Sequence, residues 1–130
     1  MRAALDVWRQ ALVTTVRQDR PDLTARQLAV LLTVYLTAPP HTVRGLALVL
    51  NISKPAVTRA LDRLGAFGFV KRKQDEADKR NVLVQRTVKG SVYLSEFGEI
   101  VNRAMQESGH ETPLESRSGQ SGIQSKRDDQ

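Results

Sequence analysis

The sequence predicts a mainly α-helical fold, of the α+β class, that carries one small β-hairpin. Apolar residues recur at the spacing of one helix face in several separate stretches, and prolines or glycines divide these stretches. A single pair of short apolar segments flanks a charged loop, a pattern typical of a hairpin. The expected helices span residues 2–18, 24–37, 42–50, 53–64 and 91–105.

The first expected helix carries an apolar stripe made of Leu5, Trp8, Leu12 and Val16. An amphipathic helix of this kind needs an apolar surface to cover its stripe. That surface is either the chain's own core or a second copy of the chain, and the helical spacing is compatible with both.

The second expected helix is predicted to be central and buried. Thr24 is a suitable N-cap, and apolar residues cover most of the helix circumference up to about Thr37. Pro39 and Pro40 end the helix, because proline cannot continue it.

The third expected helix begins after Thr42, a second N-cap, and ends near Leu50. Asn51 follows at a turn, where asparagine tolerates a positive φ. Leu48 and Val49 lie outside the inward face of this helix. They form either a locally apolar surface or a contact with a partner protein.

The fourth expected helix has a front of short and basic side chains. Ser53 is a good N-cap, and a proline in the first turn is tolerated. The buried side is expected to hold Val57, Ala60, Leu61 and Leu64. The exposed side is expected to hold Thr58, Arg59, Asp62 and Arg63, with Pro55 and Ala56 near the front. Such a front can reach base edges in the major groove of DNA, which bulky side chains would block.

A basic hairpin is expected behind this helix. Gly65 and Gly68 end the helix, and a strand that starts at Phe69 continues into three basic residues. Residues 74–81 form a polar loop, and a second strand begins at Val82 and ends near residue 87.

Residues 23–94 resemble the winged helix-turn-helix domain of the MarR family of bacterial transcription regulators. The resemblance is carried by the ordered segments LTARQLAVL, TVRGLALVLNIS and KPAVTRALDRL. Single residues follow at characteristic distances, namely Gly68, Arg72, Asp75, Asp78, Arg80, Thr87 and Gly90. The resemblance implies a regulator that binds double-stranded DNA in a sequence-specific manner.

The expected DNA contacts come from three elements. The recognition helix contributes Ser53, Lys54, Pro55, Thr58, Arg59 and Arg63. The wing contributes Arg72, Lys73, Asp78, Lys79 and Arg80, and the first helix-turn-helix element contributes Thr42 and Arg44. In the family, the wing arginine enters a minor groove and the preceding aspartate helps to hold the tip, roles that fall on Arg80 and Asp78. Two residues depart from the family pattern: Arg86 replaces a strand leucine, and Lys79 replaces a second arginine.

The resemblance also implies a homodimer formed by the first and last helices. The expected dimerisation residues are Leu5, Trp8, Leu12, Val16, Phe97 and Val101. Family members often bind small aromatic acids, so a small-molecule effector is expected as well.

The distribution of charge supports a nucleic-acid partner. Residues 40–90 hold 11 Lys or Arg and 4 Asp or Glu, whereas the rest of the chain holds 9 basic and 10 acidic residues. The net charge of +6 therefore comes from the predicted DNA-binding segment. A merely solvated basic face is the alternative, but the basic residues coincide with the motif.

Several other classes of function find no support in the sequence. The chain has no cysteine, and its two histidines, His41 and His110, lie far apart, so neither a metal site nor a cofactor is expected. No constellation of catalytic residues is present, so an enzyme is not expected. No apolar run is long enough for a membrane span and no signal peptide is visible, so the protein is expected to be cytoplasmic.

The sequence divides into four expected parts. They are a first helix (1–20), the DNA-binding domain (21–90), a last helix (91–107) and a disordered tail (108–130). The tail is polar and glycine-rich, with too few large apolar residues to offset the entropy of ordering.

A second function class remains open. The same winged helix could instead dock on another protein through Leu48, Val49 and the N-terminal stripe. The two classes differ in their response to salt, because DNA binding weakens steeply with salt and an apolar interface does not.

Overall fold

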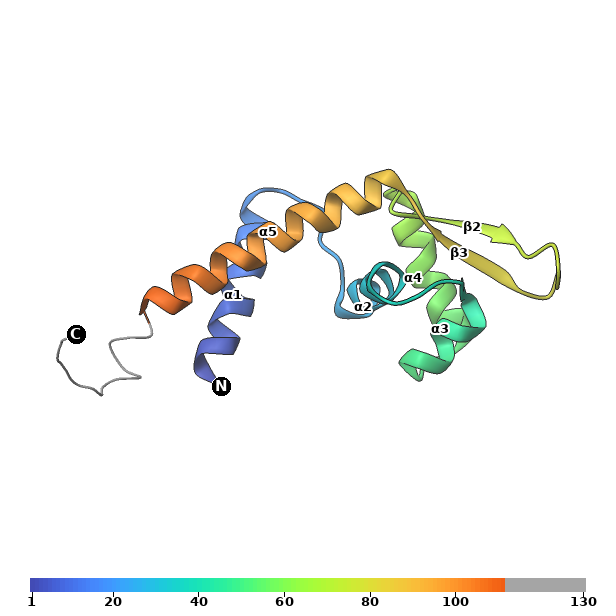
Figure 1. The fold of residues 1–130 in the computed structure, drawn as a ribbon, viewed down its shortest axis with the longest axis horizontal. Coiled ribbons are helices and arrows are strands. Elements are labelled where there is room, and N and C mark those ends of the chain that lie inside the picture. The colour runs from blue at the N-terminus through green and yellow to red at the C-terminus, as the bar shows by residue number, and fades with distance from the viewer. Residues whose placement is uncertain (112–130) are drawn as a thin grey trace. The chain divides into compact units, whose positions relative to one another are not determined.

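The computed structural model describes residues 1–111. In this part of the chain the elements are α1 (Arg2–Arg17), α2 (Ala25–Leu36), β1 (His41–Thr42), α3 (Val43–Leu50), α4 (Lys54–Ala66), β2 (Val70–Gln74), β3 (Val82–Arg86) and α5 (Val88–Glu111) (Figure 1). The predicted mainly helical α+β class is confirmed. The chain divides into two compact units, of which one is Leu23–Ser95. The other comprises Met1–Asp22 and the described residues from Glu96 onward.

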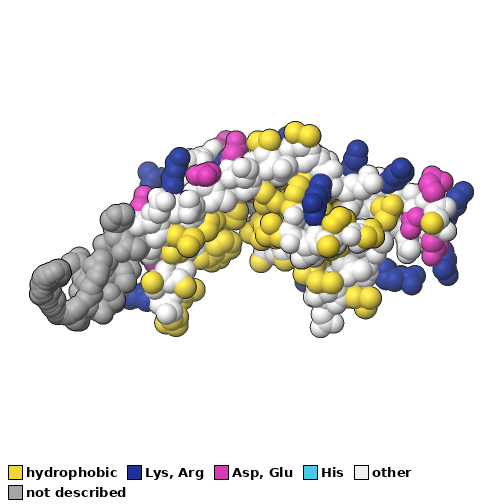
Figure 2. Space-filling view, in the orientation of Figure 1, with side chains coloured by type: hydrophobic (Ala, Val, Ile, Leu, Met, Phe, Trp, Pro, Cys, Tyr) yellow, Lys and Arg dark blue, Asp and Glu magenta, His cyan; other side chains and the backbone are white. Residues whose placement is uncertain are grey.

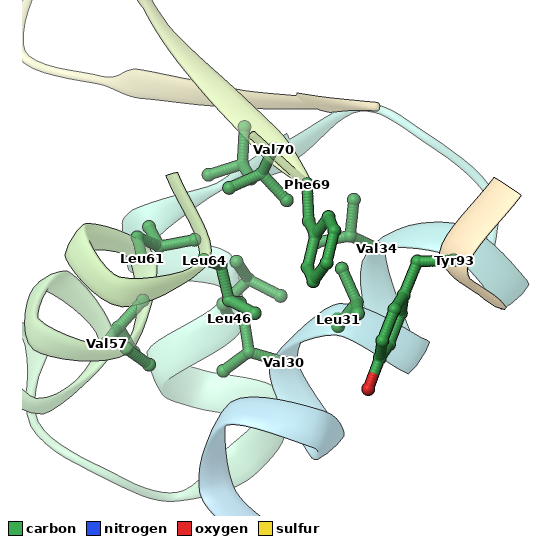
Figure 3. Close-up of a cluster of buried hydrophobic side chains, with 12 residues drawn as sticks. Val30, Leu31, Val34, Leu46, Val57, Leu61, Leu64, Phe69, Val70 and Tyr93 are labelled. Atoms are coloured by element: carbon green, nitrogen blue, oxygen red, sulfur yellow. The ribbon is translucent and has the colours of Figure 1, made fainter. Parts of the chain in front are cut away.

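The core of the Leu23–Ser95 unit lies between α2, α3, α4 and the start of β2 (Figure 3). Leu31 of α2, Leu46 of α3 and Leu61 of α4 are almost completely buried there. Phe69 stacks on Tyr93 of α5 with ring centroids 4.4 Å apart. The prediction that α2 is central and buried is confirmed, because three of its residues have no exposed surface: Val30, Leu31 and Val34.

Side-chain caps fix where three of these helices begin. Thr24 and Gln27 form a reciprocal capping box at the start of α2. Thr42 Oγ1 accepts a hydrogen bond from the Gly45 N–H at 2.9 Å, and Ser53 Oγ accepts one from the Ala56 N–H at 3.2 Å. The three predicted N-caps are confirmed, and Asn51 adopts the expected left-handed conformation, with φ 54°.

The sheet contains one strand more than the sequence predicted. Strands β2 and β3 form the expected antiparallel hairpin, and β1 pairs antiparallel with β3, so the order is β1-β3-β2. His41 lies opposite Val84 in the register of β1 and β3. A strand of only two residues has no periodicity to detect, and only its tertiary pairing defines it.

Thr87 connects the wing to α5. Its side-chain oxygen accepts a hydrogen bond from the Gly90 N–H at 2.9 Å and donates one to the Gly68 carbonyl at 2.7 Å. Its backbone N–H donates to the Tyr35 hydroxyl at 2.8 Å. Because Thr87 acts as an N-cap, α5 begins at Val88. The predicted start at residue 91 was therefore three residues too late.

Gly90 lies in the first turn of α5, where there is no room for a side chain. A Cβ atom built on this glycine would collide with the Tyr35 hydroxyl and with the Phe69 carbonyl oxygen. The Tyr35 hydroxyl donates to that same carbonyl at 2.7 Å. A glycine at this position therefore lets the base of the wing, α2 and α5 approach one another closely.

Arg86, which replaces the leucine expected from the family pattern, has a definite structural role. Its Nε donates to the Val34 carbonyl at 2.8 Å and its Nη2 to the Thr37 carbonyl at 2.9 Å. Both carbonyls lie at the C-terminal end of α2, where a positive charge is favourable. The substitution thus ties the end of β3 to the end of α2.

The last helix is longer than predicted. Helix α5 continues to Glu111, so the expected boundary between a helix ending at 107 and a tail starting at 108 was wrong. Adding polar residues to an existing helix requires no new nucleation, which explains the extension. The rest of the predicted disordered tail, residues 112–130, lies outside the described residues.

In the unit formed by α1 and the later part of α5, the rings of Trp8 and Phe97 meet edge to face with centroids 6.2 Å apart. Leu5, Leu12 and Val16 of the stripe remain 59%, 41% and 61% exposed. The chain's own packing therefore covers only part of the stripe. Among residues 1–111, no helix combines the length and the apolar character required to cross a membrane.

Candidate nucleic-acid interface

The front of α4 exposes most of the side chains that the sequence assigned to it. Thr58, Arg59 and Arg63 are exposed, as are Ser53, Lys54 and Pro55 at the start of the helix. Ala56 is only 6% exposed, so the expectation that it lies near the front was wrong. It stands four residues before Ala60, on the same buried face of the helix.

Two of the three arginines proposed on the faces of α4 and β2 are engaged within the protein. The guanidinium carbon of Arg63 lies 4.8 Å from the centroid of the Phe67 ring, a cation–π contact at the end of α4. Arg72 Nη2 of β2 donates to Asp62 Oδ1 of α4 at 2.8 Å. No local pattern in the sequence predicts this second contact, because the two residues lie in different elements. Arg59 is the third, and it projects from α4 with its side chain exposed.

At the tip of the wing, Arg80 and Asp78 form a fork. Arg80 Nε donates to Asp78 Oδ1 and Arg80 Nη2 donates to Asp78 Oδ2, both at 3.0 Å. The Arg80 backbone N–H also donates to Asp78 Oδ1 at 3.2 Å. The aspartate thus holds both the backbone turn and the guanidinium, a planar two-point contact that lysine could not make.

The fork shifts the ionisation of both partners. Hydrogen bonds from the Arg80 side chain, and then from its backbone, lower the pKa of Asp78 below its usual value of 3.8. The positive charge of Arg44 acts in the same direction. Asp78 in turn raises the pKa of Arg80. The fork is therefore ionised on both sides at neutral pH.

The remaining polar groups of the tip are used to shape the loop. Asp75 Oδ1 accepts a hydrogen bond from the Ala77 N–H at 3.0 Å, and Gln74 Nε2 donates to the Lys79 carbonyl at 3.0 Å. The Asn81 N–H donates to the Asp78 carbonyl at 2.9 Å. Residues 1–111 contain no group of three or more side chains that could hold a metal ion. The carboxylates of Asp75 and Asp78 thus act in turn formation.

Basic side chains gather on the Leu23–Ser95 unit around the wing, with acidic side chains among them at the tip (Figure 2). Lys73 and Lys79 are exposed, and Arg44 is exposed near the start of α3. The side-chain oxygen of Thr42 accepts the hydrogen bond that caps α3. The influence of Arg44 on Asp78 places a positive charge of the first helix-turn-helix element within electrostatic reach of the wing tip.

Sequence reasoning missed one basic residue near the recognition helix. A cleft of about 460 Å³ separates the start of α2 from α4, and both Arg26 and Arg59 line it. The sequence around Arg26 predicts only the N-cap of α2. The proximity of the two arginines follows from the packing of α2 on α4, which no local pattern reports.

Comparisons with known proteins agree on one family. A model of the MarR family matches residues 23–82. The multiple antibiotic resistance protein MarR of Escherichia coli K12 is 37% identical over 82 residues. This match covers 63% of the present chain and 56% of that protein, so the chain spans little more than half the length of this curated relative.

Solved structures with the same fold include complexes with DNA. A mutant of E. coli MarR in complex with operator DNA is 30% identical, with a TM-score of 0.63 over 82% of this chain and 74% of that one. The transcriptional repressor CouR, bound to a 23-mer DNA duplex, is 26% identical, with a TM-score of 0.67 over 90% of this chain and 78% of that one.

Proposed function

This chain belongs to the MarR family, and we propose that it is a transcription regulator that binds double-stranded DNA in a sequence-specific manner. The observation that carries the proposal is the exposed front of α4, with Thr58 and Arg59, in the same compact unit as the basic wing. A relative of the same fold forms a complex with operator DNA, which supports the same class of partner here.

In this proposal α4 enters the major groove. Thr58 and Arg59 contact base edges, because threonine can bond or touch several bases and arginine can bond guanine at two points. The start of α4 and the first helix-turn-helix element contact the phosphate backbone and set the register. These backbone contacts come from Ser53, Lys54, Pro55, Thr42 and Arg44, and Arg63 adds one from the end of α4.

The wing contacts the adjacent minor groove. Arg80 reaches into the groove, where the negative potential attracts a guanidinium, and Asp78 keeps it in a defined orientation. Lys73 and Lys79 lie beside it and contact phosphates. Arg72 was expected among the wing contacts as well, but it pairs with Asp62 of α4 in the structure.

The protein acts as a homodimer in this proposal. A dimer lets two recognition helices read two half-sites about 10 base pairs, or a multiple of that, apart. The exposed part of the α1 stripe, together with the half-buried Val101 of α5, supplies the apolar surface. Phe97 was expected in this interface as well, but it is only 7% exposed and packs against Trp8 of the same chain. The proposal also includes a cytoplasmic location, and it includes a small-molecule effector as the family resemblance implies.

Selection of bound sequences from random duplex DNA tests this function directly. We expect an enriched motif with two related half-sites. The logarithm of the binding constant for this motif should fall linearly with the logarithm of the salt concentration. Recovery of no motif, together with equal affinity for all duplexes, would contradict sequence-specific binding.

A second candidate function is docking on another protein through α3. Leu48 and Val49 are 76% and 69% exposed, which is unusual for adjacent aliphatic side chains. Leu48→Ser together with Val49→Ser leaves DNA affinity unchanged if these residues serve a protein partner. A loss of DNA affinity in this variant would place α3 at the DNA instead.

A further inference from the structure

The ion pair between Asp62 and Arg72 joins the proposed recognition helix to the wing. Arg72 Nη2 lies 2.8 Å from Asp62 Oδ1, and the side chains of Arg72 and Asp62 are 35% and 62% exposed. Asp62 lies on α4 and Arg72 on β2, so one contact spans the two elements that are expected to enter neighbouring grooves.

This contact is not needed to hold the two elements in the fold. Leu61 and Leu64 of α4 are completely buried, and Val70 at the start of β2 is 3% exposed. Exposed ion pairs contribute little to the free energy of unfolding, because solvent and salt screen them. The role of the pair therefore lies in how its two charges act at the protein surface.

Asp62 stands where a negative charge opposes binding to DNA. It is exposed on the same side of α4 as Arg59 and Arg63, the side proposed to face the DNA. An unpaired carboxylate at this place would repel the duplex. In the structure the Asp62 carboxylate instead accepts a hydrogen bond from Arg72. This contact directs the Arg72 guanidinium toward α4.

We propose that Asp62 determines specificity by holding Arg72 against α4. The pair fixes the base of the wing relative to the recognition helix, and it keeps one guanidinium from binding phosphates of any sequence. The inference rests on the proposed DNA-binding function. Asp62 is a positioning residue in this scheme. Arg72 acts as a brace, which means that it holds the wing against α4 and does not contact phosphates.

The test compares Asp62→Asn and Arg72→Gln with the unchanged full chain. Affinity is measured on the preferred duplex and on a random duplex over a range of salt concentrations. Asp62→Asn keeps the side-chain shape but releases Arg72. The slope of log K against log salt on random DNA should therefore steepen by about 0.9, the value for one added phosphate contact. The ratio of preferred to random affinity should fall about tenfold, a typical size for a lost discriminating contact.

Arg72→Gln separates the two possible roles of the arginine. As a brace, Arg72 contributes no phosphate contact, so its loss should lower the affinity ratio and leave the salt slope on random DNA unchanged. The double variant should behave like Arg72→Gln alone, because the two side chains act as one unit. A slope that becomes shallower by about 0.9 in Arg72→Gln would make Arg72 a phosphate contact and overturn the proposal.

Two controls complete the experiment. Glu99→Gln also removes one exposed negative charge, but from the later part of α5, and should change neither slope nor ratio. Asp62→Glu keeps the charge and should retain most of the affinity ratio. An unchanged ratio in Asp62→Asn would refute the inference while leaving the DNA-binding function intact. Absence of specific binding by the unchanged chain would refute the function itself, so the two failures are distinguishable.

Discussion

Arg59 on the exposed front of α4 is free to reach a base. Within residues 1–111, no hydrogen bond or ion pair engages its side chain, whereas Arg72 and Arg80 are both bound to carboxylates. An arginine without an internal partner loses no protein contact when it binds DNA. At the residue scale, some side chains are therefore available to bind DNA, whereas others are held by contacts within the protein.

Arg59→Ala should cost about 1–3 kcal/mol of binding free energy on the preferred duplex and much less on random DNA. Titration of both duplexes by fluorescence anisotropy measures the two losses. Arg103→Ala removes an exposed arginine from the later part of α5 and serves as the matched control. Equal losses on both duplexes would make Arg59 a phosphate contact.

The Asp78 carboxylate should titrate below its usual value of 3.8, because the Arg80 side chain and backbone stabilise its charged form. A group whose pKa is lowered by folding adds stability above its unfolded pKa and loses it as the pH falls through the folded pKa. The fork should thus persist at neutral pH and open only in strong acid. NMR titration of the carboxyl carbon can follow this, and Arg80→Ala should move the midpoint upward.

Asp78→Ala should weaken DNA binding, although it removes a negative charge from a DNA-binding surface. The reason is that Arg80 then loses the fork that orients it. Simple electrostatics predicts the opposite sign, so the direction of the change in affinity is decisive. Tighter binding by Asp78→Ala would show that the aspartate has no positioning role.

At the scale of elements, the junction of β3 and α5 fixes the position of the wing relative to α2 and the first turn of α5. Thr87, Tyr35 and Gly90 form one connected set of contacts there. The resemblance singled out Thr87 and Gly90 by position, and the structure supplies their reason: one caps α5, and the other leaves space for the Tyr35 hydroxyl.

Gly90→Ala should destabilise the protein by about 1–3 kcal/mol, the usual cost of overpacking a tight site. The added methyl group would collide with the Tyr35 hydroxyl and the Phe69 carbonyl oxygen. Gly98→Ala in the same helix is the matched control, since a Cβ there meets nothing within 4 Å. This control should gain up to about 1 kcal/mol from better helix propensity. Urea unfolding of both variants measures the difference, and equal effects would contradict the steric argument.

At the scale of the whole molecule, the exposed stripe of α1 predicts a dimer. Val16→Glu should convert a species of about twice the chain mass into a monomer, because a charge would then enter an apolar interface. Val16 is a better site for this test than Trp8, whose ring also contacts Phe97 in the same chain. Sedimentation velocity at micromolar concentration gives the mass.

Val88→Glu provides the control for the dimer experiment. Val88 is 83% exposed at the first position of α5 and lies outside the stripe, so its substitution should leave the mass unchanged. A monomer in the unchanged chain at every accessible concentration would contradict the dimer prediction.

The sequence predicted those features that depend on neighbours along the chain. Three N-caps and the buried stripe of α4 were predicted correctly because each depends on a few consecutive residues. The end of α5 was misplaced because the extension of a helix through polar residues leaves no local mark. The burial of Ala56 was missed because a small residue shows little preference for either face of a helix.

By itself, the sequence determined the mainly helical class, the hairpin behind the fourth helix, the family resemblance and the concentration of positive charge between residues 40 and 90. These follow from periodicity, capping and composition, which act over short stretches of chain. Only the tertiary structure decided that β1 joins the sheet, that Arg86 binds the end of α2 and that Arg72 reaches Asp62. Each of these contacts joins residues of different elements, and their geometry exists only after the chain has packed.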